Sequence, residues 1–223
     1  MSRPDITPEE VIIQTEDAQL SGNLTVPADA VGLVIFAHGS GSSRHSRRNR
    51  YVAQVLNQAQ LGTLLFDLLT EDEERIDNRT RELRFDIPLL SQRLIGTIDW
   101  TRHNAELNGL HIGLFGASTG AAAALNAAAA RPQQVGAVVS RGGRPDLAAD
   151  ALAQVKSPTL LLVGGNDPQV IELNTQAADQ LVAPHTLHIV PGATHLFEEP
   201  GKLEEVAGLA RDWLRRYLVR NEH

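Results

Sequence analysis

The chain alternates short, almost fully apolar runs with longer segments of helical character, and this alternation constrains its fold more than any other feature. The apolar runs favour strands and lie at residues 33–37, 63–66, 112–115, 137–139, 160–163 and 187–190. The longer segments favour helices and lie at residues 50–60, 88–107, 119–130, 146–154, 169–182 and 203–219. Strands that are apolar on both faces and joined through helices form parallel sheets covered on both sides. The sequence therefore predicts an α/β domain.

Two further strands are predicted upstream, at residues 11–14 and 20–26, with Asp17 in the turn between them. Their short connection favours an antiparallel hairpin. The sheet then has about eight strands, with only this first pair antiparallel. The 223 residues contain no internal repeat and no linker, and a chain of this length usually forms one domain. We expect a single doubly wound domain over residues 1–223.

Composition excludes several classes of function. The 20 Lys and Arg residues against 27 Asp and Glu give a net charge of −7, which argues against a nucleic-acid partner, since such proteins draw their affinity from neutralised phosphates. The chain has no Cys, which excludes a disulfide framework, a thiolate zinc site and a cysteine nucleophile. No apolar segment has the length of a signal-peptide core or a membrane span. We therefore expect a cytoplasmic protein without a membrane partner.

Polar and glycine-rich turns follow four of the predicted strands, at the edge where open α/β sheets bind ligands. In chain order they read His38-Gly39-Ser40-Gly41, Gly116-Ala117-Ser118-Thr119-Gly120, Gly164-Gly165-Asn166-Asp167 and Pro191-Gly192-Ala193-Thr194-His195. A serine, an aspartate and a histidine thus arrive in that order, each just past a strand. This set predicts a site for nucleophilic catalysis.

Ser118 is the candidate nucleophile, because residues 116–120 match the pattern G-x-S-x-G directly between a strand and an Ala-rich helix. Such a turn strains the serine backbone and lifts its hydroxyl clear of the sheet. The glycines leave room for the adjacent strand and helix. The alternative interpretation is an ordinary serine that caps the helix.

His195 is the best candidate base among the eight His residues, because a serine hydroxyl needs a base to take its proton. Asp167 would hold the imidazole tautomer and stabilise the imidazolium. Asp146, one strand earlier, is the competing acid. His38 is interpreted as a structural anchor of its loop.

An oxyanion hole needs two backbone N–H groups aimed at the developing charge. Thr119, which follows the nucleophile and starts its helix, is the first candidate donor. Ser40 is the second, with Gly41 as the alternative.

Together these motifs resemble the α/β-hydrolases, and the compact chain is similar to their dienelactone hydrolase-like group. The resemblance covers nearly the whole chain, from His38-Gly39 through Ser118 and Asp167 to His195. It implies a three-layer fold with no large lid domain, and hydrolysis of carboxylic esters or lactones through an acyl-enzyme without metal or cofactor. Dienelactone hydrolases of the usual type have a cysteine nucleophile, so Ser118 is expected to act as in a general serine esterase.

Two charged segments carry further predictions. Residues 70–84 form either a solvated loop or short exposed helix, or a border of the active-site mouth. The basic cluster of residues 44–50 is either a set of exposed charges or a binding site for a substrate carboxylate or phosphate. In the second interpretation Arg47 and Arg48 contact the substrate, and Arg141 and Gly41 are further candidates for lining its pocket.

The sequence leaves several alternatives open. A serine peptidase or an acyltransferase can use the same triad, and a non-catalytic binding module can share the fold. We expect the partner to be a small ester or lactone, and the chain to be a monomer or a homodimer.

Overall fold

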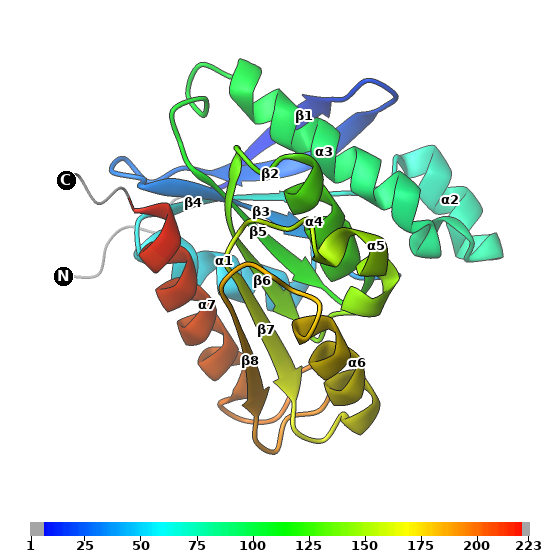
Figure 1. Cartoon of the computed structure of the whole chain (residues 1–223). Helices are drawn as coiled ribbons and strands as arrows, with labels where there is room; N and C mark the ends of the chain where they lie inside the picture. Colours follow the sequence, from blue (N-terminus) through cyan, green and yellow to red (C-terminus); the bar gives the residue numbers. More distant parts are fainter. Residues whose placement is uncertain (1–6, 220–223) are drawn as a thin grey trace.

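A computed structural model describes residues 7–219 and shows a central sheet with helices on both faces (Figure 1). The sheet has eight strands in the order β1-β2-β4-β3-β5-β6-β7-β8. They are β1 (Glu9–Gln14), β2 (Gln19–Thr25), β3 (Gly32–Ala37), β4 (Leu61–Phe66), β5 (Ile112–Ala117), β6 (Val135–Arg141), β7 (Thr159–Gly164) and β8 (His185–Val190). This is the three-layer α/β-hydrolase architecture that the sequence predicts.

The order of the strands reverses at β3, which makes this strand a topological switch point of the sheet. β1 pairs with β2, and β2 with β4, in antiparallel fashion, so the antiparallel part extends one pairing beyond the predicted hairpin. All other pairings are parallel. After β3 the chain builds β4 on one side and then returns to place β5 on the other. Ligands bind at such a switch point, outside the carboxyl ends of the strands.

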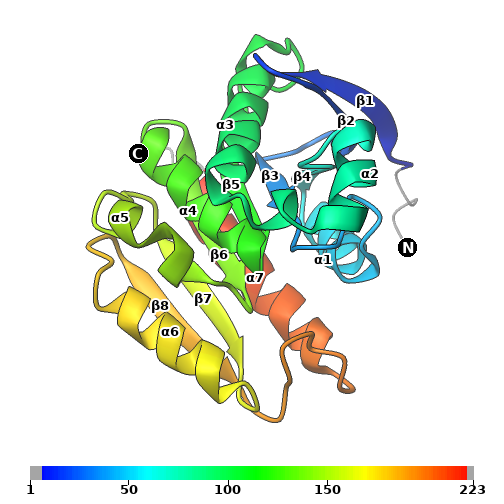
Figure 2. The same ribbon diagram turned by 90° about the vertical axis from the view of Figure 1, so that its right-hand side faces the viewer.

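Two helical layers cover the sheet and divide its core. On one face, α1 (Arg47–Gln58) and α7 (Lys202–Leu218) pack over a cluster that contains Phe36 and Phe115. On the other face lie α3 (Ile87–His103), α4 (Thr119–Ala130), α5 (Ala149–Leu152) and α6 (Pro168–Ala178). Figure 2 views the molecule from the side of this second layer. The central strands β3, β4, β5 and β7 are buried throughout, because both their faces are covered.

Three predicted helices differ most from the structure, at an end or in type. The segment predicted at 88–107 ends at His103, because turn-forming residues follow from Asn104. The one predicted at 169–182 ends at Ala178. The one predicted at 146–154 is a 3₁₀ turn, η2 (Pro145–Ala148), followed by the single turn α5.

Residues 70–84 form a helix, α2 (Glu71–Thr80), and a 3₁₀ turn, η1 (Leu83–Phe85). Thr70 and Glu73 make a capping box at the start of α2. Glu73 also accepts two hydrogen bonds from Arg93 of α3, at 2.7 and 2.9 Å, and Arg93 bonds Asp17 at 2.9 Å. Arg93 is almost fully buried. These ion pairs fix α2 against α3 and the β1–β2 hairpin.

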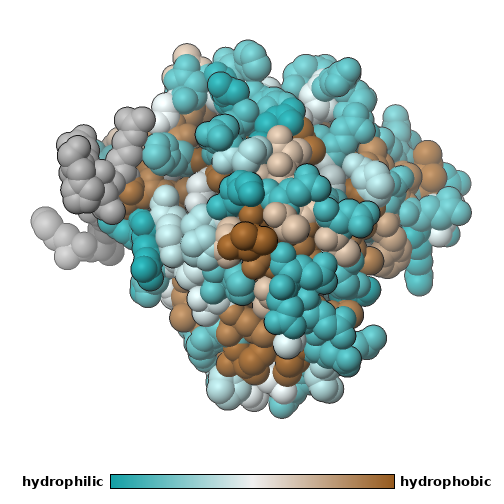
Figure 3. Space-filling model, viewed as in Figure 1, coloured by the Kyte–Doolittle hydropathy of each residue, from teal (hydrophilic) through white to brown (hydrophobic). Residues whose placement is uncertain are grey.

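The surface is predominantly hydrophilic on the face seen in Figure 1, with hydrophobic residues gathered in separate patches (Figure 3). Phe85 and Val182 are among the large hydrophobic side chains that remain exposed. Across residues 7–219, none of the helices combines the length and apolar character that a membrane span requires.

Candidate active site

Ser118 occupies a strained turn between β5 and α4. Its backbone has φ 52° and ψ −121°, a conformation that a residue with a side chain adopts at a cost of about 1–3 kcal/mol. The Ser118 hydroxyl does not cap α4, which rules out the helix-capping interpretation. The backbone is held by the Ser118 N–H, which donates to the carbonyl of Arg141 at 3.2 Å. The fold therefore maintains the strain and leaves the hydroxyl free.

Two glycines make this turn possible. A Cβ added to Gly116 would lie 2.4 Å from the Cα of Ala121, and one added to Gly120 would lie 2.2 Å from the carbonyl oxygen of Ala37. Both distances are far inside van der Waals contact. Strand β5 and helix α4 thus approach each other and β3 as closely as backbones can.

Asp167 and His195 form a hydrogen-bonded pair at the ends of β7 and β8. The Oδ2 atom of Asp167 lies 2.8 Å from Nδ1 of His195, and the two side chains are 18% and 40% exposed. The competing acid, Asp146, instead receives two hydrogen bonds from Arg144. A carboxylate on Nδ1 leaves the other ring nitrogen, Nε2, free to accept a proton.

The end of β6 contacts both Ser118 and His195. Arg141 accepts the hydrogen bond of the Ser118 N–H, and a Cβ added to Gly142 would lie 3.4 Å from Cε1 of His195. Ser118 and His195 therefore both contact the short Arg141–Gly142 backbone. Among the hydrogen bonds described for residues 7–219, none comes from the Ser118 hydroxyl.

The loop after β3 faces the nucleophile. Residues 39–42 form a tight turn closed by the Ser42 N–H on the carbonyl of Gly39 at 3.1 Å, with Gly41 at φ 70°. A Cβ on Gly39 would lie 3.2 Å from Cβ of Ser118, so this loop touches the elbow. Thr119 is the first residue of α4, and the first N–H groups of a helix have no partner inside it. The candidate oxyanion donors, Ser40 and Thr119, thus stand on both sides of Ser118.

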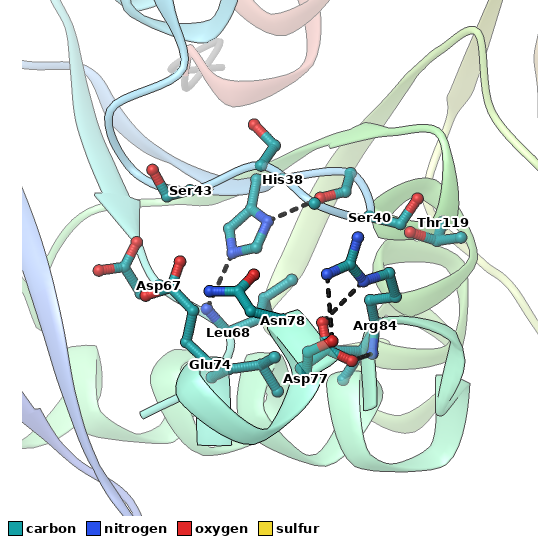
Figure 4. A pocket seen from close by; sticks show the side chains of 15 residues that line it. His38, Ser40, Ser43, Asp67, Leu68, Glu74, Asp77, Asn78, Arg84 and Thr119 are labelled. Atoms are coloured by element: carbon teal, nitrogen blue, oxygen red, sulfur yellow. Dashed lines mark hydrogen bonds and ion pairs between the residues drawn. The ribbon is translucent and has the colours of Figure 1, made fainter. Parts of the chain in front are cut away.

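A small cavity of about 40 Å³ lies between these donors and α2. We call it the α2 cavity. Ser40 and Thr119 line one side, and Asp77 and Arg84 line the other (Figure 4). Gly41 also lines the cavity. Leu68 and Leu90 add apolar surface. Residues 70–84 thus contain a short, largely exposed helix, as the first interpretation of this segment allows, and they also border the cavity beside Ser40 and Thr119.

Arg84 is held in this wall by Asp77. The Arg84 Nε donates to Oδ2 of Asp77 at 2.7 Å, and the Arg84 backbone N–H donates to Oδ1 at 3.0 Å. Burial raises the pKa of Asp77, but the hydrogen bonds and charge of Arg84 outweigh it and hold that pKa below its ordinary value. Figure 4 shows the guanidinium of Arg84 near Ser40 and Thr119. Sequence reasoning missed this residue, although the capping box at Thr70 signals the helix that positions it.

His38 anchors its loop, as predicted. Its Nε2 accepts the N–H of Leu68 at 3.1 Å, and its Nδ1 donates to the carbonyl of Gly39 at 2.9 Å (Figure 4). Both ring nitrogens are thus used by the backbone. Burial lowers the pKa of His38 below its ordinary value, so the ring is neutral at pH 7.

This burial predicts a loss of stability in mild acid. The unfolded chain binds a proton at His38 below about pH 6.5 while the folded chain does not, so stability is complete above that pH and falls below it by at most about 1.4 kcal/mol per unit. Urea unfolding at pH 7.5, 6.5 and 5.5 measures the slope. We expect a flatter slope in His38→Asn than in wild type or in His103→Asn, the exposed control. Equal slopes in the two variants would contradict the prediction.

The basic cluster divides into different environments. Arg44 pairs with Asp67, and Arg50 bonds His45. Arg47 is exposed at the first residue of α1. Arg48 contacts Glu198, close to His195 in the chain. Arg141, the last residue of β6, is buried. It remains a prediction that a substrate contacts Arg47, Arg48, Arg141 and Gly41.

A metal site is not formed by the described part of the chain. Residues 7–219 contain no group of three or more His, Asp or Glu side chains placed to hold a metal ion.

Comparison with known proteins identifies close relatives. Residues 47–218 match the sequence profile named "Dienelactone hydrolase family". A dienelactone hydrolase from Anabaena variabilis has a crystal structure with 58% identity and a TM-score of 0.93, covering 96% of this chain and 100% of that one. Est1E from Butyrivibrio proteoclasticus is 16% identical, with a TM-score of 0.78 over 94% of this chain and 98% of its own. That second likeness shows the fold alone.

Two curated relatives from Mycobacterium tuberculosis carry another name. Each is 55% identical over 215 residues and is provisionally named a phosphoribosyl transferase. The match covers 96% of this chain but 48% of each relative. The chain thus spans about half the length of these proteins.

Proposed function

Because this chain belongs to the dienelactone hydrolase family, we propose that it is a serine hydrolase that cleaves small carboxylic esters or lactones. Membership of the family supports hydrolysis in general. The serine chemistry rests on the residues of this chain, which has Ser118 at the elbow and no Cys in its sequence.

The proposed reaction passes through an acyl-enzyme. Nε2 of His195 takes the proton of the Ser118 hydroxyl as the oxygen attacks the ester carbonyl carbon, and Asp167 stabilises the imidazolium. The N–H groups of Ser40 and Thr119 bind the resulting oxyanion. The imidazolium returns its proton to the leaving alkoxide, which departs as the alcohol. A water molecule then attacks the acyl carbon with His195 as base, and the acid and free Ser118 are released.

The observation that carries this proposal is the 2.8 Å pair of Asp167 and His195 beside the strained Ser118. A serine that only caps a helix would not need the strained backbone of Ser118. A histidine that is only a surface residue would not need the hydrogen bond to Asp167. Fluorophosphonates test it, because they modify only an activated serine. We expect stoichiometric labelling at Ser118 in the native protein and none after denaturation. A native protein that remains unlabelled would instead favour the non-catalytic binding module.

Ester length is a second expected property. The α2 cavity has a small apolar lining of Leu68, Leu69 and Leu90, and around it lie the polar and charged side chains of Ser43, Glu74, Asn78 and Arg84. A long alkyl chain would lie against these groups or extend into solvent, so it gains little from burial. We expect kcat/KM for p-nitrophenyl acetate or butyrate to exceed that for the ester of about twelve carbons by about tenfold or more. The reverse order would show that the acyl group lies elsewhere.

The name of the mycobacterial relatives describes proteins about twice as long as this chain, so we do not propose phosphoribosyl transfer for it. A panel of amides and of alcohol acceptors, run beside the esters, separates an esterase from a peptidase or an acyltransferase using the same triad.

A further inference from the structure

The chain that follows β6 holds the nucleophile turn at two points. We call residues 141–144 the β6 loop. The Ser118 N–H donates to the carbonyl of Arg141 at 3.2 Å, and the Ser118 carbonyl accepts the N–H of Arg144 at 3.1 Å. The strained conformation of Ser118 therefore depends on where the β6 loop lies.

The same loop packs against the histidine. A Cβ added to Gly142 would lie 3.4 Å from Cε1 and 3.5 Å from Nδ1 of His195, and Nδ1 is the atom that bonds Asp167. The Gly142 N–H donates to the carbonyl of Leu162 in β7 at 2.7 Å. A movement of the β6 loop would thus change the position of Ser118 and the packing of His195 together.

Asn174 ties this loop to α6. The residue is fully buried, and its Nδ2 donates to the carbonyl of Gly143 at 3.1 Å and to the carbonyl of Val170 at 2.8 Å. Helix α6 begins directly after Asp167, which is its N-cap residue. Figure 2 shows α6 on the same face of the sheet as α4, the helix that begins at the Ser118 turn. One amide thus links the β6 loop to the helix that follows the candidate acid.

An asparagine is a costly choice for this position. Its Oδ1 is buried and has no hydrogen-bond partner among the described residues, and burying an unpaired polar atom is unfavourable. The two carbonyls beside the amide are acceptors, so they fix Nδ2 as the atom that faces them. A side chain that served packing alone would be apolar, as Val170 and Ala177 are on the same buried face of α6.

We propose that Asn174 is a positioning residue for the triad, which holds the β6 loop against α6 and so sets the Ser118 turn relative to the pair of Asp167 and His195. Its effect on the reaction rate rests on the proposed ester hydrolysis, whereas the arrangement itself does not. Without the Nδ2 donor the buried carbonyl of Gly143 loses this hydrogen bond, and the loop can move away from α6. A small misplacement of reacting groups lowers the rate strongly.

Asn174→Leu removes the amide while it keeps a side chain of the same branched shape. Single-turnover release of p-nitrophenol from p-nitrophenyl acetate measures the acylation rate constant and the half-saturating concentration separately. We expect the rate constant to fall about tenfold or more. The half-saturating concentration should change less than about twofold, since Asn174 is not among the residues that line the α2 cavity. An unchanged rate constant in the folded variant would overturn the proposal.

Asn57→Leu is the matched control. Asn57 on α1 also donates through Nδ2 to a backbone carbonyl, that of Leu61, at 2.9 Å. Leu61 is the first residue of β4, so this bond lies at the amino end of its strand. We expect Asn57→Leu to lower stability in urea unfolding and to keep the wild-type acylation rate constant, compared per chain that a fluorophosphonate labels. Equal losses of rate in the two variants would show that Asn174 acts through stability alone.

A measurement without turnover separates this proposal from the proposed function. The Nδ1 proton of His195, in its hydrogen bond to Asp167, gives a low-field proton resonance that His195→Ala assigns. We expect this signal to shift or broaden in Asn174→Leu and to stay in place in Asn57→Leu. That result would support the positioning role even if the wild type hydrolysed no ester. An identical signal in wild type and Asn174→Leu would overturn it.

Asn174→Ser covers the case in which leucine prevents folding. The serine hydroxyl can still donate to the Val170 carbonyl within α6, but the side chain is one atom shorter and no longer bridges to Gly143. We expect this variant to fold and to show the same loss of acylation rate. A wild-type rate constant in Asn174→Ser would contradict the role of the Gly143 hydrogen bond.

Discussion

Replacing Ser118 by alanine is expected to lower kcat for p-nitrophenyl acetate by about 10⁴-fold or more, because no other group in the proposed mechanism forms the acyl-enzyme. The change removes one oxygen whose hydroxyl makes no hydrogen bond among the described residues. The fold should therefore be unaffected, because alanine keeps the Cβ from which the strain of the turn arises. Initial rates and a urea unfolding curve measure both quantities.

Ser21→Ala on β2 is the matched control, since it makes the same chemical change on a strand that carries no triad residue. We expect it to keep wild-type turnover and labelling. His195→Ala and Asp167→Ala should also lose most activity, with the loss smaller for Asp167, whose role is to orient and stabilise the histidine. Turnover that survives in Ser118→Ala would assign the chemistry to another nucleophile.

The second large effect is expected at Gly120, where alanine should lower the free energy of unfolding by about 3 kcal/mol. The new Cβ would meet the carbonyl oxygens of Ala37 and His38 at 2.2 and 2.5 Å. Both are backbone atoms at the end of β3, so no side chain can rotate away to make room. The helix must move outward from the sheet, and Ser118 with it. We therefore expect lower turnover as well as lower stability.

Gly208→Ala is the matched control for this change. Gly208 lies within α7, and a Cβ there would have no atom within 4 Å. Alanine is the better helix former, so the same substitution should raise stability by about 0.5–1 kcal/mol. Denaturant unfolding of both variants at one pH gives the comparison. Equal effects at the two positions would contradict the close approach of α4 and β3.

Much of this architecture was predictable because its signals are local. The buried strands are continuous apolar runs, and the elbow has glycines on both sides of Ser118. The residue that pairs with His195 was harder to assign, since Asp146 and Asp167 both follow strands. Only the three-dimensional arrangement shows that Arg144 binds Asp146 and that Asp167 reaches His195.

Other features have no signal in the composition of their own segment. The burial of Arg141 depends on Phe115 and on α1, which lie far away in the chain, so the sequence pattern does not distinguish it from the exposed Arg47. Helix α2 is different. The Thr70–Glu73 capping box marks where this helix begins. The many charged residues that follow are equally compatible with a solvated loop. Arg84, which follows α2, lines the α2 cavity, and its hydrogen bonds to Asp77 hold it there.

The attachment of α2 has a consequence for how this scaffold can diversify. The helix buries no hydrophobic side chain, and within the described chain its one buried residue is Asp77. Two ion pairs join it to the rest of the molecule: Glu73 pairs with Arg93, and Asp77 pairs with Arg84. Under the proposed function, mutations on its cavity side would change substrate preference without opening holes in either hydrophobic cluster. The cavity side of α2 can therefore vary as long as Glu73 and Asp77 keep their arginine partners, whereas the glycines of the elbow have no room for a side chain.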